Sequence, residues 1–196
     1  MQPRLRLVLL ACFVAFALDG GAVSAQLPTK QKVIDLLRGN DFDGYQELVN
    51  MGAKAFPIYE EILTDPNADD GNVGRVLLVI GNVKTDRRRF IKRAVSRLTD
   101  RDFGVRLNAV LLLKDIGSPA ETSPVVALLS DKRVEIIYAA AKTLAAIGGP
   151  NEVVAMDVWL RGASDRDDPK LLRHVRKCRD ALKKRLEEPR AKDPSK

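Results

Sequence analysis

Residues 104–117 read GVRLNAVLLLKDIG, and residues 135–148, which lie 31 positions further on, read EIIYAAAKTLAAIG. The two stretches carry apolar, small and glycine residues in one register: Val105 with Ile136, Ala109 with Ala140, Leu113 with Leu144, Ile116 with Ile147 and Gly117 with Gly148. Apolar residues four, four and three positions apart mark one face of an α-helix rather than a strand. The alanines predict close contact between helices, and each terminal glycine predicts a helix stop in the left-handed conformation.

A second kind of helix precedes each of these two. Residues 123–131, SPVVALLSD, place proline near a helix start and aspartate at its end, and residues 56–65, FPIYEEILTD, repeat that pattern. Residues 88–100, RRFIKRAVSRLTD, are a copy without proline, and residues 72–81, NVGRVLLVIG, are an earlier copy of the glycine-terminated helix. The unit is helix, aspartate turn, helix, glycine turn, with a period of about 31 to 36 residues, which indicates a solenoid.

The period predicts an all-α fold, a right-handed α-solenoid of about five antiparallel helical hairpins. We place the hairpins at roughly 29–51, 54–83, 86–117, 119–148 and 150–188. The middle helices are apolar on nearly all sides, as expected for helices packed between two neighbours, and the terminal repeats are expected to be atypical. A compact bundle is the alternative, but it would not require the turns to recur in register. Aromatic residues make up only 5% of the chain, which is low for a sandwich or barrel.

The first 25 residues have the form of a secretory signal peptide. Arg4 and Arg6 give a positive start, residues 7–18 are an apolar run of twelve, and small residues precede a cleavage site expected after Ala25. A transmembrane helix needs about twenty apolar residues, so no integral membrane anchor is expected. A lipoprotein is a second interpretation because Cys12 follows a lipobox-like sequence, but this cysteine lies in the middle of the apolar run. We therefore expect a secreted, periplasmic protein.

The remaining chain divides into a solenoid at 26–188 and a disordered basic tail at 189–196. The formal net charge of +7 falls to +6 when the two arginines and one aspartate of the signal peptide are removed. Only Cys178 then remains, so no intramolecular disulfide is expected, and pairing of this cysteine between two chains stays open. The mature chain is long enough to be held together by its apolar core alone.

The pattern of residues 102–117, D-x2-V-R-x2-A-x3-L-x2-I-G, resembles the HEAT repeat, particularly the short class named after the phycobilisome lyases. The resemblance covers about residues 54–162. It implies a helical solenoid whose first helices lie on the convex side and whose second helices lie on the concave side. Most proteins of this family are scaffolds that bind other proteins and a few are enzymes, so fold alone does not settle function. Ile137 stands where the pattern has Arg106, and Asp70 falls near that position in the earlier copy.

Few residues of the mature chain could support catalysis. His174 and Cys178 lie four positions apart on one helix, where they could form a thiolate–imidazole pair or half of a metal site. Cys178 also aligns with the buried alanine position of the repeat, where a cysteine acts as a small apolar residue. No other histidine or cysteine is available to complete a zinc site. We therefore expect no catalytic residues, cofactor or metal, and keep a lyase-like HEAT-repeat enzyme as the alternative.

An aspartate-rich segment, residues 64–72, resembles a calcium loop, with candidate ligands Asp65, Asn67, Asp69 and Asp70. Its glycine falls one position late, and Val76 occupies the twelfth position, where a calcium loop has glutamate. Residues 39–44 and 164–169 are similar turns. Aspartate in such turns mainly caps helices, so calcium binding stays open as the less favoured interpretation.

One predicted helix, residues 86–99, carries a basic stripe. Arg89, Arg93 and Arg97 lie at i, i+4 and i+8, and the full set of cations is Arg87, Arg88, Arg89, Lys92, Arg93 and Arg97. Arginines at a helix start oppose the helix dipole at a cost of about 0.3–1 kcal/mol each. Two interpretations remain: a solvated face on which arginine stems cover apolar surface, or a docking surface for an anionic partner.

The resemblance also places candidate partner-binding residues on the concave face: Arg106, Asn108, Lys114, Tyr138 and Lys142. The sequence thus predicts a non-catalytic scaffold that binds a protein partner, an acidic one if the basic stripe is the contact. A binder of an anionic polymer or membrane surface is a further alternative. Nucleic acid is not expected, because the chain is exported and has few aromatic residues for base stacking. The identity of the partner and the oligomeric state do not follow from the sequence.

Overall fold

The computed structural model describes residues 27–39, 41–162 and 168–188, and within them the chain forms helices and no strands. The expected signal peptide, the expected tail and most of the aspartate turn at 164–169 lie outside the described residues. The elements, in chain order, are α2 (Lys30–Arg38), α3 (Phe42–Met51), η1 (Gly52–Ala55), α4 (Phe56–Thr64), α5 (Asp70–Asn82), η2 (Arg87–Phe90), α6 (Ile91–Ser96), α7 (Phe103–Ile116), η3 (Pro119–Glu121), α8 (Thr122–Ala127), η4 (Leu128–Ser130), α9 (Val134–Ile147), α10 (Pro150–Gly162) and α11 (Pro169–Glu187).

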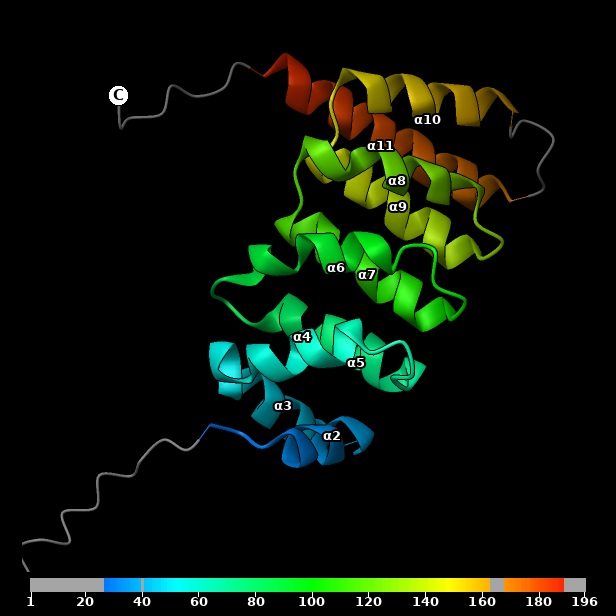
Figure 1. Cartoon of the computed structure of the whole chain (residues 1–196). Helices are drawn as coiled ribbons and strands as arrows, with labels where there is room; N and C mark the ends of the chain where they lie inside the picture. The colour runs from blue at the N-terminus through cyan, green and yellow to red at the C-terminus, as the bar shows by residue number, and fades with distance from the viewer. Residues whose placement is uncertain (1–26, 40, 163–167, 189–196) are drawn as a thin grey trace, which may run out of the picture.

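Consecutive helices pair as hairpins, and the hairpins stack along one direction from α2 at one end to α10 and α11 at the other (Figure 1). The second helices of successive hairpins pack side by side, α5 against α7, α7 against α9 and α9 against α11. The first helices α4, α6, α8 and α10 form the other layer. This arrangement confirms the predicted all-α solenoid of helical hairpins.

The core runs along the whole stack because each middle helix is packed between two neighbours. Ala109 of α7 and Ala140 of α9 are fully buried, as the shared small residue predicts. Thr143 of α9 is also fully buried, and its hydroxyl donates to the carbonyl oxygen of Val110 at 3.1 Å. Close packing and this hydrogen bond fix the register between the α7 and α9 helices.

The helix-terminal glycines do not adopt the predicted left-handed conformation. Gly117 has φ −74° and ψ 176°, and Gly148 has φ −70° and ψ 166°, so the chain leaves α7 and α9 in an extended direction. A Cβ atom would lie 2.6 Å from the carbonyl oxygen of Leu113 at Gly117 and 2.4 Å from that of Leu144 at Gly148. Glycine is therefore required here by close backbone approach and not by a positive φ.

The predicted basic helix at 86–99 is shorter than expected. It consists of the 3-10 turn η2 followed by a six-residue α6 that ends at Ser96. Asp86, before this turn, has φ 53°, an uncommon conformation for a residue other than glycine. The three arginines that would oppose the dipole of a long helix therefore lie in this short turn instead.

Candidate functional site

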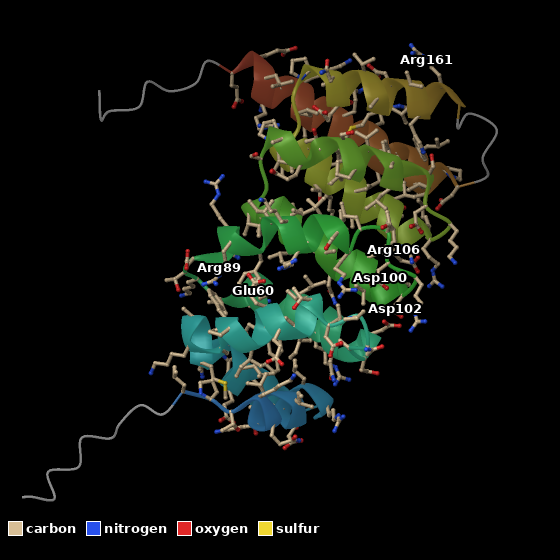
Figure 2. The ribbon with its side chains drawn as sticks, viewed as in Figure 1. Glu60, Arg89, Asp100, Asp102, Arg106 and Arg161 are labelled. Atoms are coloured by element: carbon tan, nitrogen blue, oxygen red, sulfur yellow. The ribbon has the colours of Figure 1, made fainter. Side chains whose placement is uncertain are left out.

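Two arginines of the basic stripe share one carboxylate of the preceding hairpin. The Nε atoms of Arg89 and Arg93 lie 3.7 and 3.1 Å from the carboxylate oxygens of Glu60 on α4. Glu60 and Arg89 come from neighbouring hairpins and lie close together in Figure 2. The Arg89 guanidinium also lies 5.7 Å from the ring centroid of Phe90, within cation–π range. Both arginines therefore tie two hairpins together, although each side chain remains exposed.

Two other cations of the stripe donate to backbone carbonyl groups. Arg97 donates from Nη2 to the carbonyl oxygen of Leu63 at 2.8 Å, and Arg87 donates to that of Gly81 at 2.6 Å. Arg88 and Lys92 are exposed and have no ion-pair partner among the described residues. The stripe is thus not a continuous free cationic line, because most of its guanidinium groups stabilise the solenoid.

Arg106 is buried, with only 5% of its surface exposed. Its guanidinium donates from Nε and Nη2 to the two carboxylate oxygens of Asp131, at 2.9 and 3.1 Å. Nη1 donates to the carbonyl oxygens of Asp100 and Arg101, at 2.9 and 3.1 Å. Figure 2 shows Arg106 close to the turn that holds Asp100 and Asp102. The expected concave-face position of Arg106 is thus corrected: its donors are satisfied inside the protein, where a partner does not reach them.

We call the exposed surface of the second helices α5, α7, α9 and α11 the second-helix face. The other candidate residues of the concave set lie on two of these helices, α7 and α9. Asn108 is partly buried and donates to the carbonyl oxygen of Gly74 at 2.9 Å, which joins α7 to α5. Lys114 and Tyr138 are partly exposed and Lys142 is exposed. Asn108 therefore has a structural role, while the other three side chains keep part of their surface exposed on this face.

One hollow of about 200 Å³ opens on the second-helix face between α5 and α7. Leu78 and Leu111 line it, and Leu78 is among the large apolar side chains that remain exposed. Its charged residues are balanced, because Lys114 Nζ lies 3.3 Å from the carboxylate of Asp115. This hollow is therefore apolar with an electrically neutral rim.

A second hollow of about 370 Å³ opens on the same face between α9 and α11. Its lining contains no carboxylate: the residues are Lys142, Ala145, His174, Lys177, Cys178 and Ala181. Lys142 and Lys177 are exposed, and neither forms an ion pair with a described residue. The second hollow is thus cationic where the first is apolar.

The predicted contact between His174 and Cys178 is present, with 3.4 Å between Nε2 and Sγ. The same Nε2 lies 3.2 Å from the carbonyl oxygen of Tyr138. The Tyr138 ring and the imidazole are tilted by 59°, with 4.4 Å between their centroids. Burial lowers the pKa of His174 and raises the pKa of Cys178, and the nearby Lys142 and Lys177 do not overcome this effect on the thiol. Both shifts favour the neutral thiol and the neutral imidazole over a thiolate–imidazolium pair.

The aspartates of the expected calcium loop are engaged in local contacts. Asp69 caps α5 by accepting from the backbone N–H of Asn72 at 3.0 Å, and Asp65 accepts from that of Asn67 at 2.8 Å. Asp70 pairs with Arg101 at 3.1 Å. In the described part of the chain, no group of three or more histidine, cysteine, aspartate or glutamate residues is arranged to hold a metal ion. Asp69 therefore caps α5, Asp65 stabilises the turn, and Asp70 forms an ion pair.

Residues 91–176 match the family model for HEAT repeats. This match covers α6 to the first part of α11 and supports a HEAT-repeat protein, in agreement with the stacked hairpins. No curated protein matches the chain. None of the helices in the described ranges is both long enough and apolar enough to cross a bilayer.

Several residues of the site escaped the sequence analysis. Leu78, Leu111 and Lys177 line the two hollows, and none of them stood out by residue type. The sequence does contain one sign of the difference between the hollows. Lys142 corresponds to Leu111 at the repeat offset of 31 residues. One position of the repeat thus changes from apolar to cationic between α7 and α9, where each residue lines a hollow.

Proposed function

We propose that this protein is a non-catalytic scaffold that binds a protein partner through the second-helix face. HEAT repeats generally mediate protein–protein interaction, and the matched segment includes α7, α9 and the start of α11. The observation that carries the proposal is the pair of solvent-open hollows formed by second helices alone, one apolar and one cationic. Extended surfaces of this kind are what solenoids offer to a partner.

The absence of catalysis is part of the proposal. Its support is the state of the contacting pair His174 and Cys178: Cys178 is 7% exposed, and burial favours its protonated thiol. A buried neutral thiol is a poor nucleophile. The Nε2 atom of His174, which faces Cys178, also lies 3.2 Å from the carbonyl oxygen of Tyr138, so the backbone engages this nitrogen.

We further propose that the chain is exported to the periplasm through its N-terminal segment and that its repeats belong to the short phycobilisome-lyase class. The support for export is the order of a basic start, an apolar run and small residues in 1–25. The support for the class is the spacing of residues 102–117.

Site-specific photocrosslinking in cells of the source organism tests the proposal. A benzophenone amino acid replaces Leu78, which lies on the second-helix face, and in a matched variant it replaces Lys92, which is exposed on α6 in the other layer. We expect a discrete crosslinked protein from position 78 and none from position 92. Crosslinking from position 92 alone would show that the partner binds the basic stripe and not the second-helix face. Absence of a crosslinked protein from both positions would reject the scaffold function.

A further inference from the structure

The two hollows of the second-helix face lie in the same register of the solenoid. Leu111 of α7 lines the apolar hollow, and Lys142, at the corresponding position of α9, lines the cationic hollow. The sequence of helices across the face is α5, α7, α9 and α11, each packed on the next. A ligand that lies across all four helices therefore contacts the apolar hollow near one of its ends and the cationic hollow near the other.

The charge of the cationic hollow indicates which kind of ligand group it binds. Lys142 comes from α9 and Lys177 from α11, and both line the same hollow. Neither lysine is neutralised by a described carboxylate, whereas the lysine of the apolar hollow is paired with Asp115. An unbalanced pair of cations beside small alanines favours an acidic group from a partner.

The spacing of the helices gives the distance between the two positions. Packed helices lie about 8–10 Å apart, so the groove between α5 and α7 and the groove between α9 and α11 are separated by about 16–20 Å. An extended chain advances about 3.3–3.6 Å per residue. About five residues therefore connect the two hollows.

We infer that the second-helix face binds an extended acidic segment of a partner protein, with an apolar side chain in the α5–α7 hollow and carboxylates about five residues away between Lys142 and Lys177. This inference rests on the proposed scaffold function and adds the chemistry of the partner. The apolar contact would bury Leu78, and the acidic contact would supply the charge that the lysines lack.

Fluorescence anisotropy with synthetic peptides tests the inference on the full chain. The probes are labelled peptides of about twelve residues with a Leu-Leu pair and a Glu-Glu pair, in both orders and at separations from about two to eight residues. We expect the tightest binding at a separation of about five. Replacing the glutamates by glutamine is expected to weaken binding about tenfold or more. A peptide that keeps only its glutamates and binds as tightly would overturn the two-hollow arrangement, as would equal affinity at every separation.

Charge reversal supplies the specific control. Lys142→Glu with Lys177→Glu should weaken binding of the acidic peptide about tenfold and should gain affinity for the matching Lys-Lys peptide. The matched variant Lys92→Glu with Arg88→Glu alters the same number of exposed charges in the other layer and should bind as the unmodified protein does. Equal loss in both double variants would show non-specific attraction and overturn the inference. If the photocrosslinked partner is found but Lys142→Glu and Lys177→Glu leave its binding unchanged, only this inference fails and the scaffold function stands.

Discussion

Arg106 and Asp131 form a two-point ion pair between neighbouring repeats, with their side chains 6% and 9% exposed. The pair joins α7 to the turn that precedes α9. The remaining guanidinium nitrogen, Nη1, donates to two backbone carbonyl oxygens of the turn that precedes α7. One side chain therefore organises two successive interhelical turns. Such a group is costly to disturb, because its partner carboxylate is largely shielded from water.

Arg106→Ala should lower the free energy of unfolding by about 3–5 kcal/mol, because the largely buried Asp131 carboxylate would lose its charged partner and keep only the hydrogen bond from the Arg133 backbone N–H. Arg93→Ala is the matched control, since Arg93 pairs with Glu60 on the surface, and it should cost no more than about 1 kcal/mol. Urea denaturation followed by circular dichroism measures both values. Equal losses in the two variants would show that the buried pair has no special role.

The same pair makes stability depend on acid pH. Burial raises the pKa of Asp131, but hydrogen bonds from Arg106 and from the backbone N–H of Arg133 outweigh it, so the pKa lies below its ordinary value. Folding therefore favours the ionised carboxylate of Asp131. Its contribution to the free energy of unfolding is complete above about pH 4, the pKa of an aspartate in the unfolded chain. This contribution is lost as the pH falls through the lower pKa of the folded protein. Asp131→Asn should be less stable at neutral pH and should show a shallower loss below about pH 4. Parallel curves for the two proteins would contradict this assignment.

The sequence predicted the fold because the repeat is encoded locally, in the period of apolar residues and in the glycine and aspartate turns. It did not predict the burial of Arg106, because the partner carboxylate lies 25 residues downstream and only the packing of α7 and α9 brings the two together. The extended backbone conformation of Gly117 was not predicted for a similar reason. Its need for glycine comes from the nearby Leu113 carbonyl oxygen and not from its own dihedral angles.

The candidate site was predicted only in part. Lys142 and Tyr138 were placed on the second helices by resemblance to a family, and the structure puts both on the second-helix face. The basic stripe was recognised from its spacing, but the engagement of Arg89 and Arg93 by Glu60 was not, since Glu60 belongs to the preceding hairpin. Long-range pairing decides which surface charges remain free, and spacing along one helix carries no information about it.

Within the basic stripe, Arg97 and Lys92 should respond differently to truncation. Arg97→Ala removes a charged donor from the Leu63 carbonyl group and from Asp100, so it should lower the free energy of unfolding by about 1–2 kcal/mol. Lys92→Ala removes an exposed side chain and should change stability by less than about 0.5 kcal/mol. Thermal unfolding of the two variants gives the comparison. A larger loss for Lys92→Ala would contradict the assignment of Arg97 as an inter-repeat contact.

Cys178 should react slowly with thiol reagents in the folded protein. The side chain is 7% exposed, and burial raises its pKa, so little thiolate is present at neutral pH. Labelling with a chromogenic disulfide should be at least about tenfold slower in buffer than in denaturant, where the thiol has its ordinary pKa. Equally fast labelling in both conditions would reopen the interpretation of His174 and Cys178 as a catalytic pair.

His174 should make stability depend on pH near neutrality, and it is the single histidine of the sequence. Burial lowers its pKa first of all, Lys142 on α9 and Lys177 on α11 lower it further, and the contact with the Tyr138 carbonyl oxygen opposes them. Because the folded pKa lies below the unfolded value, the unfolded chain binds more protons as the pH falls through about 6.5, and the folded state is then disfavoured. The neutral imidazole therefore stabilises the α9–α11 contact only above that range.

Denaturation at about pH 7.5 and pH 5.5 measures this effect, and we expect the protein to be less stable at the lower pH. The difference should be a fraction of the roughly 1.4 kcal/mol that one pKa unit represents, because the ring is partly exposed. His174→Asn keeps a hydrogen-bond donor without the titration, so its stability should be nearly the same at both pH values. A variant that retains the full pH dependence would place the titrating group elsewhere in the chain.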